Sequence, residues 1–365
     1  MNFNIISSKI LAGKEINKEE GLFLLRMNGG EERNLLALAA EMNSRLNGNR
    51  VTYVKNRNLN FTNICAIKCK FCGFCRGEGD REAFTLNVDE ILQKLEKNPD
   101  VSEVCIQGGI NPRLDIPYYV DFLRQIKKYY PAVHIHGISP QEVHFLGANT
   151  GWPLEKVIQT LMEAGLDSMA GTAAEILVDQ VREKISPAKI PTGRWVAIIR
   201  TAHSLGLKST ATILFGHIEK ATDIIDHLDL LRGIQKETQG FTEFIPLPFI
   251  PYQTPLGADY SLSEIIPWAQ IRRFYALARV YLFPSFKNIQ TSWVKLGADR
   301  AVQTLEVGVN DFGGTLFEEN ITRSAGGNHG QYLSEEEIRK RLLRAGKVPL
   351  QRDTLYRLIG KNGSI

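Results

Sequence analysis

The stretch Leu59–Cys72 reads LNFTNICAIKCKFC and joins a short apolar run to three closely spaced cysteines. Its first part, Leu59–Thr62, has the apolar and β-branched character of a strand. Cys65, Cys69 and Cys72 follow, with three and then two residues between them. Because thiolates are soft ligands, three of them on one loop indicate a zinc site or an iron-sulfur cluster.

Further strand-like runs recur along the chain, most of them followed by a longer helix-like segment. These runs are Glu103–Gln107, Val133–Gly137, Leu166–Met169, Ser209–Phe215, Thr242–Leu247, Ile289–Trp293 and Gln303–Val307. Strands that alternate with helices predict a parallel sheet, and with Leu59–Thr62 they reach the eight that close a TIM-type barrel. We therefore predict an α/β fold, a (βα)8 barrel over residues 51–325.

Helical segments are predicted on both sides of this barrel. Lys18–Leu25 and Glu31–Leu46 carry leucine and alanine at helical spacing, so residues 1–50 are expected to form an N-terminal helical extension. Ser334–Ala345 begins with Ser-Glu-Glu-Glu and ends in basic residues, which suits the two ends of a helix dipole. Residues 326–365 are therefore predicted to form a helical tail packed on the barrel.

The composition is that of an ordinary globular chain of 365 residues. Hydrophobic residues make up 43% and charged residues 23%, which excludes intrinsic disorder. The net charge is +4 and the basic residues are scattered, so we expect no nucleic-acid partner. The sequence shows neither a secretory signal nor a run of about 20 apolar residues, which predicts a cytoplasmic protein without membrane contact.

The cysteines number five, and an odd count in a reducing compartment argues against structural disulfides. A structural zinc site usually takes two separated ligand pairs, and no second pair occurs here, so an iron-sulfur cluster is favoured. Three protein ligands would leave one of four irons open to an external ligand. Cys75 could close that position, but we expect it to be a loop thiol outside the cluster. Cys105 is expected to be an ordinary buried cysteine.

The spacing of Cys65, Cys69 and Cys72, with the aromatic Phe71 before the third, resembles the radical S-adenosylmethionine superfamily. The resemblance implies a [4Fe-4S] cluster on the three cysteines, S-adenosylmethionine bound at the open iron, and an electron donor such as ferredoxin or flavodoxin. It also implies that Phe71 and the turn Gln107-Gly108-Gly109 contact S-adenosylmethionine. Taken alone, these two glycines could simply form a turn after a strand.

Polar residues after later strands are further candidates for cofactor contacts. Ser139 and Glu142 suit hydrogen bonds to ribose hydroxyls, although the same pair could cap the following helix as a capping box. Glu219 follows the predicted strand Ser209–Phe215. In a parallel barrel, functional side chains gather at these carboxyl strand ends, so we expect the three residues near the cluster.

Longer segments carry the resemblance to one branch of the superfamily. Five segments resemble the radical enzymes that make deazaflavins and menaquinone precursors. They are Tyr53–Asn63, His134–His136, Ser168–Glu175, Gly308–Thr315 and Glu318-Glu319-Asn320. Gly171-Thr172-Ala173-Ala174-Glu175 and Gly313-Gly314-Thr315 are similar to the second subunit of FO synthase. That resemblance implies transfer of the 4-hydroxybenzyl group of L-tyrosine to 5-amino-6-(D-ribitylamino)uracil, with FO synthase subunit 1 as functional partner.

Two alternatives to this activity remain open. One is a menaquinone-branch radical enzyme, either aminofutalosine synthase or cyclic dehypoxanthine futalosine synthase. The other comes from a different class of protein, a binding or scaffold protein in which Cys75 closes the metal site.

Substrate handling is expected from residues near the predicted strand ends. The candidates for catalysis are Arg57, Glu175 and His217, and those for substrate binding are Trp293, Asn310 and Asp311. An arginine could hold the tyrosine carboxylate, while Asn310 and Asp311 suit a uracil edge or a ribityl chain. Residues such as His217 and Trp293 are more often satisfied core residues than ligands, and Asn310-Asp311 could equally form a turn with a helix cap.

Overall fold

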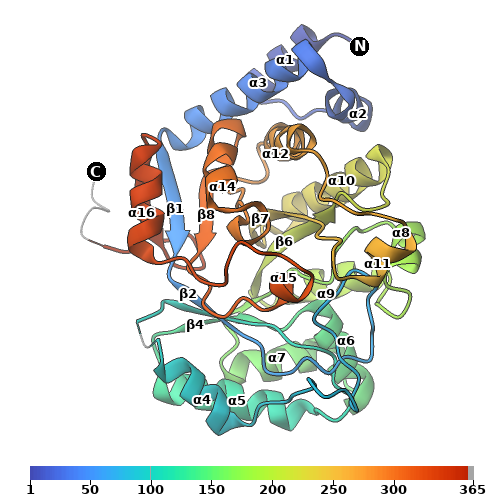
Figure 1. The fold of residues 1–365 in the computed structure, drawn as a ribbon, viewed down its shortest axis with the longest axis vertical. Coiled ribbons are helices and arrows are strands. Elements are labelled where there is room, and N and C mark those ends of the chain that lie inside the picture. The colour runs from blue at the N-terminus through green and yellow to red at the C-terminus, as the bar shows by residue number, and fades with distance from the viewer. Residues whose placement is uncertain (99, 361–365) are drawn as a thin grey trace.

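The computed structural model describes residues 1–98 and 100–360, and helices and strands alternate along most of this chain (Figure 1). Its strands are β1 (Arg50–Val54), β2 (Asn56–Leu59), β3 (Glu103–Ile106), β4 (His134–Gly137), β5 (Ser168–Met169), β6 (Lys208–Phe215), β7 (Phe241–Pro248), β8 (Asp311–Gly314) and β9 (Val348–Arg352). Its helices are α1 (Phe3–Leu11), α2 (Lys18–Arg26), α3 (Gly29–Asn47), α4 (Val88–Glu96), α5 (Ile116–Tyr129), α6 (Pro140–Thr150), α7 (Leu154–Ala164), α8 (Asp179–Ile185), α9 (Thr192–Ser204), α10 (Ala221–Thr238), α11 (Pro255–Asp259), α12 (Trp268–Leu282), α13 (Trp293–Leu296), α14 (Ala298–Thr304), η1 (Leu305–Val307), α15 (Ile321–Ser324) and α16 (Glu335–Arg344). The predicted α/β class is confirmed.

The main sheet consists of β2 to β7, which are parallel and follow one another in sequence order. Asn58 lies opposite Cys105, and Cys105 lies opposite His136. Helices connect successive strands and cover the outer face, as parallel sheets require. The sheet curls into a half-barrel, so the side chains on its inner face surround a common interior.

A second parallel sheet, in the order β8-β1-β9, stands beside the half-barrel. β1 passes into β2 at Lys55, so the two sheets share one continuous segment. Ile289 forms an isolated bridge to β7, and Gln290 forms another to β8. On the other side the backbone N–H of Asn56 donates to the Thr315 hydroxyl at 3.0 Å. The interior is thus enclosed by two sheets that are joined by single bridges and hydrogen bonds.

The prediction of eight paired strands in one closed ring is therefore wrong, because two of the eight predicted segments do not form strands. Ile289–Trp293 contributes only bridges before α13 begins, and Gln303–Val307 forms the end of α14 and the η1 turn. Short apolar runs do not distinguish a strand from a helix by periodicity alone. Their places are taken by β1 and β8, which were not predicted. The first predicted strand, Leu59–Thr62, is displaced toward the C-terminus relative to β2.

The N-terminal helices cover one end of the half-barrel, where α3 packs against α12 and α2 packs against α10 and α12 (Figure 1). The helices predicted at Lys18–Leu25 and Glu31–Leu46 are observed as α2 and α3. α2 begins with a capping box in which the Asn17 side chain accepts from the Glu20 N–H at 2.8 Å.

The C-terminal segment contains the predicted helix and a strand that was not predicted. α16 begins at Glu335, and the Ser334 side chain accepts from the Glu337 N–H at 3.2 Å. After this helix the chain returns as β9 and pairs with β1. Residues 361–365, the end of the predicted tail, lie outside the described residues.

Candidate active site

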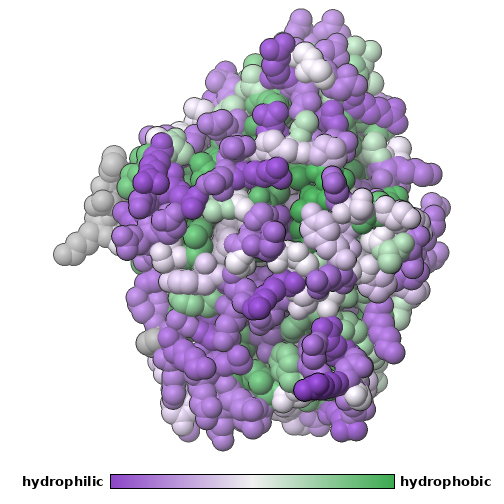
Figure 2. Space-filling model, in the orientation of Figure 1, coloured by the Kyte–Doolittle hydropathy of each residue, from purple (hydrophilic) through white to green (hydrophobic). Residues whose placement is uncertain are grey.

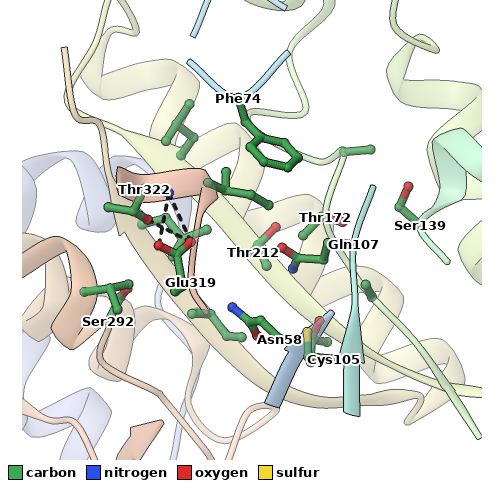
Figure 3. Close-up of a pocket in the computed structure, with 18 of the residues that line it drawn as sticks. Asn58, Phe74, Cys105, Gln107, Ser139, Thr172, Thr212, Ser292, Glu319 and Thr322 are labelled. Atoms are coloured by element: carbon green, nitrogen blue, oxygen red, sulfur yellow. Dashed lines mark hydrogen bonds between the residues drawn. The ribbon is translucent and has the colours of Figure 1, made fainter. Parts of the chain in front are cut away.

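A cavity of about 370 Å³ lies inside the curled sheet (Figure 3). Its lining comes from the cysteine loop after β2, from the inner faces and carboxyl ends of the following strands, and from the segments after β8. In Figure 3, Ser139 lies on one side of this space and Glu319 and Thr322 on the other. A concave pocket with converging polar side chains at the ends of parallel strands is the expected place for an active site.

The three cysteines of the loop, Cys65, Cys69 and Cys72, all line this cavity. The Cys65 sulfur accepts a hydrogen bond from the Ile110 N–H at 3.3 Å, which fixes the loop against the segment after β3. The neighbouring Cys75 thiol lowers the pKa of Cys65 to about 5, while burial raises the pKa of Cys69 to about 12. The described cysteines are free thiols, so all three are available as ligands.

The remaining two cysteines also reach the cavity. The Cys75 sulfur lies 3.4 Å from the Cys65 carbonyl oxygen, to which it donates a hydrogen bond. Cys105 lies on β3 and faces the interior, where burial raises its pKa (Figure 3). Cys105 was expected to be an ordinary core residue, and its position on the cavity lining is therefore a difference from that expectation.

The turn Gln107-Gly108-Gly109 packs directly beneath the cysteine loop. A Cβ atom on Gly109 would lie 2.2 Å from the Ile64 carbonyl oxygen and 2.9 Å from the Cys65 Cβ. A Cβ atom on Gly108 would lie 2.5 Å from the Phe61 ring. No side chain fits either position, so the two glycines allow the turn to lie against the loop and line the cavity with backbone.

Ser139 and Glu142 form the capping box at the start of α6, which confirms the capping alternative. The Ser139 N–H donates to Glu142 Oε2 at 2.6 Å. Both residues also line the cavity, and the second carboxylate oxygen, Oε1, is buried with no hydrogen-bond partner among the described residues. Burial raises the pKa of Glu142 to about 7, although the hydrogen bonds from Ser139 oppose this change. A ligand hydroxyl could therefore satisfy the free oxygen.

Glu175 forms an ion pair with a lysine that the sequence analysis did not single out. The Lys189 ammonium lies 2.5 Å from Glu175 Oε1 and 5.1 Å from the centre of the Phe71 ring. Burial alone would lower the pKa of Lys189, but the charges of Cys69 and Glu175 raise it above its ordinary value. A buried cation thus stands beside the cysteine loop. Its position in a loop after α8 gives no pattern by which sequence could identify it.

The opposite side of the cavity is formed by the segments around α13 and α15. Trp293 packs there, and its indole N–H donates to the Gly314 carbonyl oxygen at 2.8 Å. Lys295, from the same short helix, and Glu319 also line the cavity. Neither Lys295 nor Glu319 was assigned a role from the sequence, because nothing in their spacing places them near the cysteines.

Arg57 does not lie on the cavity. Its strand neighbours Asn56 and Asn58 line the interior, and since side chains alternate along a strand, Arg57 points to the other face. There it hydrogen-bonds to Asn98 and lies 2.8 Å from a Glu318 oxygen. This position does not fit the predicted role as a catalytic residue that holds the substrate carboxylate.

His217 and Glu219 stabilise the turn after β6 and are likewise absent from the cavity lining. Glu219 accepts from the Gly216 N–H at 2.5 Å and from the His217 N–H at 2.9 Å. His217 Nε2 lies 3.1 Å from the Leu214 carbonyl oxygen. The polar atoms of both side chains thus bond to the backbone of the turn. The positions of His217 and Glu219 do not fit the catalytic and cofactor-binding roles predicted for them.

Asn310 precedes β8, Asp311 is the first residue of that strand, and both side chains are structural. Asn310 Oδ1 accepts from Arg279 Nη2 at 2.7 Å and from the Ile289 N–H at 2.9 Å. Asp311 binds the Arg352 guanidinium. Both side chains are buried outside the cavity lining, which does not fit the predicted contacts with uracil or the ribityl chain.

The molecular face seen in Figure 2 is mostly hydrophilic, with hydrophobic side chains visible in smaller areas between the hydrophilic ones. Within residues 1–98 and 100–360, none of the helices combines the length and apolar character that crossing a membrane requires.

Comparison with known proteins identifies the family. Residues 59–231 match the radical SAM superfamily, and residues 238–363 match the CofH/MqnC C-terminal region. The chain belongs to the radical SAM superfamily. Together the two matches span the half-barrel and the segments that complete the cavity, and they place the chain in the CofH/MqnC family of radical SAM enzymes.

Curated relatives match the chain over most of its length. The 5-amino-6-(D-ribitylamino)uracil–L-tyrosine 4-hydroxyphenyl transferase of Methanococcus maripaludis strain C7 is 42% identical over 95% of this chain and 98% of that protein. The protein of the same name from Archaeoglobus fulgidus is 44% identical over 88% of this chain and 92% of that protein.

Solved structures share the radical SAM fold at much lower sequence identity. The FeFe-hydrogenase maturase HydG of Carboxydothermus hydrogenoformans superposes with a TM-score of 0.75 at 17% identity, over 97% of this chain and 80% of that chain. Methylornithine synthase (PylB) gives a TM-score of 0.72 at 19% identity, over 94% of this chain and 97% of that chain. These similarities support the α/β radical SAM fold.

The cavity residues fit the two groups that radical SAM enzymes require, a [4Fe-4S] cluster and S-adenosylmethionine. Three free thiols from one loop face one cavity, and an unpartnered Glu142 oxygen faces it as well. Within the described part of the chain, no three His, Cys, Asp or Glu side chains converge as they would on a single metal ion. A [4Fe-4S] cluster instead takes its thiolates on separate irons.

Proposed function

We propose that this chain is a 5-amino-6-(D-ribitylamino)uracil–L-tyrosine 4-hydroxyphenyl transferase in the biosynthesis of the deazaflavin FO. The observation that carries the proposal is the 42% identity, over 95% of the chain, to a relative of that name. In the proposed reaction the Cα–Cβ bond of L-tyrosine breaks and the 4-hydroxybenzyl group joins the diaminouracil. The products are 5-amino-5-(4-hydroxybenzyl)-6-(D-ribitylimino)-5,6-dihydrouracil and 2-iminoacetate.

Residues on the cysteine side of the cavity would hold the cofactors. Cys65, Cys69 and Cys72 would bind the [4Fe-4S] cluster, and the Gln107-Gly108-Gly109 turn would approach S-adenosylmethionine. Ser139 and Glu142 would bind its ribose hydroxyls. When bound, the cluster and S-adenosylmethionine would together supply a 5'-deoxyadenosyl radical, which is the chemistry that hydrogen abstraction from the substrate needs.

The charges beside the cysteine loop favour an anionic cluster. Lys189 is close enough to Cys69 for the two charges to interact, and its ion pair with Glu175 holds the ammonium in place. The Phe71 ring lies beside the same ammonium. Lys189 would thus balance negative charge on the thiolates without itself binding iron.

The interior away from the cysteines is polar and suits the diaminouracil. Glu103, His136, Glu243 and Arg352 all line the cavity. They bring hydrogen-bond donors and acceptors to the depth of the half-barrel, where a uracil edge and the ribityl hydroxyls need partners. With both substrates bound between the two sheets, less bulk water would reach the reacting atoms, which would protect reactive radicals and keep the substrates in contact.

Two protein partners belong to the proposal. An electron donor such as ferredoxin or flavodoxin would reduce the cluster, and FO synthase subunit 1 would close the deazaflavin ring in the next step. The first requires an approach to the cysteine loop, and the second requires only release of the coupled product.

An anaerobic turnover assay tests the proposed function. Protein with a reconstituted cluster is incubated with S-adenosylmethionine, a reductant, L-tyrosine and the diaminouracil, and the products are analysed by mass spectrometry. We expect 5'-deoxyadenosine together with the coupled dihydrouracil. Cleavage of S-adenosylmethionine without coupling would contradict the proposal. The same assay is repeated with a futalosine-type nucleoside or an enolpyruvyl benzoate in place of tyrosine and the diaminouracil. Turnover of either compound, together with no coupling of tyrosine to the diaminouracil, would support the menaquinone-branch alternative.

A further inference from the structure

Lys295 is a lysine on the cavity lining whose charge is not paired. It lies on α13, is partly buried, and burial lowers its pKa. Within residues 1–98 and 100–360, no carboxylate lies within ion-pair distance of the Lys295 ammonium and no side-chain hydrogen bond contributes to its pKa. Lys189, the other lysine of the cavity, is in contrast paired with Glu175 at 2.5 Å.

Glu319 is a buried carboxylate on the same side of the cavity. Its two oxygens accept from the Thr322 N–H at 3.0 and 3.1 Å, and Oε1 also lies 3.2 Å from the Thr322 hydroxyl (Figure 3). These bonds hold the carboxylate in one orientation. The Glu319 charge acts on Lys295 and raises its pKa, yet the two groups form no ion pair in the described structure. A fixed anion and an unpaired cation thus line the same cavity, and they are close enough for the Glu319 charge to act on Lys295.

We propose that Lys295 binds the α-carboxylate of L-tyrosine and that Glu319 binds its α-ammonium group. The inference rests on the proposed function and names the residues that would hold its amino-acid substrate. An α-amino acid carries opposite charges on groups attached to one carbon, so it fits between a cation and an anion that are close but unpaired. The substrate carboxylate would give Lys295 the counterion that it lacks, and the substrate ammonium would donate to the Glu319 carboxylate that Thr322 already orients.

Other occupants fit this pair less well. The diaminouracil carries hydroxyls and amide-type groups but no carboxylate, so it leaves the Lys295 charge uncompensated. S-Adenosylmethionine does contain an α-amino acid, but its proposed contacts are Gln107–Gly109, Ser139 and Glu142. Ser139 follows β4 and Glu319 follows β8, and the two lie on opposite sides of the space in Figure 3.

Ligand binding to the holoenzyme tests the assignment without turnover. Protein with its cluster and S-adenosylmethionine, but without reductant, is titrated anaerobically with L-tyrosine, tyramine or 3-(4-hydroxyphenyl)propionate in a calorimeter. Tyramine lacks the carboxylate and the propionate lacks the amine. Since a hydrogen bond between charged groups contributes a factor of roughly 10 to 100 in affinity, we expect wild-type protein to prefer tyrosine by about that factor over either analogue.

The variants separate the two contacts. Lys295→Met should abolish the preference for tyrosine over tyramine, and Lys295→Arg should retain much of it. Glu319→Gln should instead abolish the preference for tyrosine over the propionate. Lys287→Met, at an exposed lysine close to α13 in sequence, is the matched control and should change neither preference. If Lys295→Met does not fold, Lys295→Gln is used in its place.

Each contrary result has its own meaning. Retention of the tyrosine preference in a folded Lys295→Met protein overturns the inference, while coupling by the wild-type enzyme would leave the proposed function intact. A loss of S-adenosylmethionine affinity in Lys295→Met equal to the loss of tyrosine affinity also overturns it, because Lys295 would then bind the cofactor. Wild-type holoenzyme that consumes no tyrosine overturns the proposed function, and with it this inference.

Discussion

The Arg352 guanidinium donates hydrogen bonds to both carboxylate oxygens of Asp311, with Nη2 lying 3.0 Å from Oδ1. Arg352 is the last residue of β9, and Asp311 is the first residue of β8. The same guanidinium lies 3.2 Å from Glu243 on β7. All three side chains are buried, so this network fastens the C-terminal strand to the two elements that complete the enclosure.

Replacing Arg352 with methionine should strongly destabilise the protein. The variant would leave the carboxylates of Asp311 and Glu243 buried without their cation, and breaking such a pair costs about 3 to 5 kcal/mol of unfolding free energy. Denaturant unfolding followed by circular dichroism measures this loss. Arg357→Met is the matched control, because Arg357 is exposed and its pairing with Asp353 should contribute no more than about 1 kcal/mol. Equal stability of the two variants would contradict the prediction.

The sequence allowed much of the half-barrel to be predicted, because most of its strands lie in or beside short runs with apolar or β-branched residues that alternate with amphipathic helices. The strands β1 and β9 were not predicted. Each is held in strand conformation by pairing with a segment far away in sequence, and the local residue pattern does not show such pairing. Gln303–Val307 shows the opposite error. Its apolar residues suit a strand, yet the segment forms the end of α14 and the η1 turn, which is followed by Gly308 at a φ of +110°.

The site was predictable where its residues are adjacent in sequence and unpredictable where folding brings them together. The cysteine loop, the glycine turn and the Ser139–Glu142 box are local patterns, and all of them line the cavity. Lys189 and Lys295 are isolated residues, and Glu319 belongs to the segment Glu318-Glu319-Asn320; all three approach the other site residues only in the folded chain. The role predicted for Arg57 does not fit for a local reason. Arg57 lies between Asn56 and Asn58 on β2, and because these two side chains face the interior, the Arg57 side chain points away from it.

Replacing Arg57 should therefore affect stability and not substrate affinity. Arg57→Met removes an ion pair with Glu318 on the outer side of β2, so the unfolding free energy should fall while the KM for tyrosine stays within about twofold of the wild-type value. Steady-state kinetics and denaturant unfolding of the same preparation check the two parts. An increase in KM comparable with that of Lys295→Met would show that Arg57 reaches the substrate after all.

Cys75 should not be a cluster ligand. Although its sulfur lies near Cys65, its thiol donates to the Cys65 backbone carbonyl, and a fourth thiolate would block the open iron. Cys75→Ala should therefore retain the iron content and cleavage of S-adenosylmethionine, whereas Cys65→Ala should lose both. Iron analysis and electron paramagnetic resonance of the reduced proteins measure the outcome. Iron loss in Cys75→Ala as complete as in Cys65→Ala would indicate a closed cluster and favour the scaffold alternative.

Gly109 should tolerate no side chain. A Cβ atom there would meet the Ile64 carbonyl and the Cys65 Cβ, so Gly109→Ala must displace the cysteine loop. A displacement of about 1 Å costs on the order of 100-fold in rate, and we expect turnover to fall by about that factor. Gly79→Ala, where a Cβ atom would have no neighbour within 4 Å, is the control and should keep wild-type turnover. Equal turnover of the two variants would contradict the packing argument.

Because the pKa of Glu142 is raised in the folded state, the unfolding free energy of the protein should fall as the pH rises toward neutrality. Burial raises its pKa from 4.5 to about 7, so the folded state keeps a proton that the unfolded state releases between these values. The stabilising contribution is complete below the unfolded pKa and is lost as the pH passes through the folded pKa, a change of up to about 3 kcal/mol. Glu142→Gln removes the titrating group but keeps an acceptor for the Ser139 N–H. Between about pH 5 and about pH 8, the wild-type protein should therefore lose more unfolding free energy than the variant, by up to that amount. Parallel pH profiles of the two proteins, measured with the cluster bound and without S-adenosylmethionine, would show that Glu142 is ionised throughout this range in the folded state.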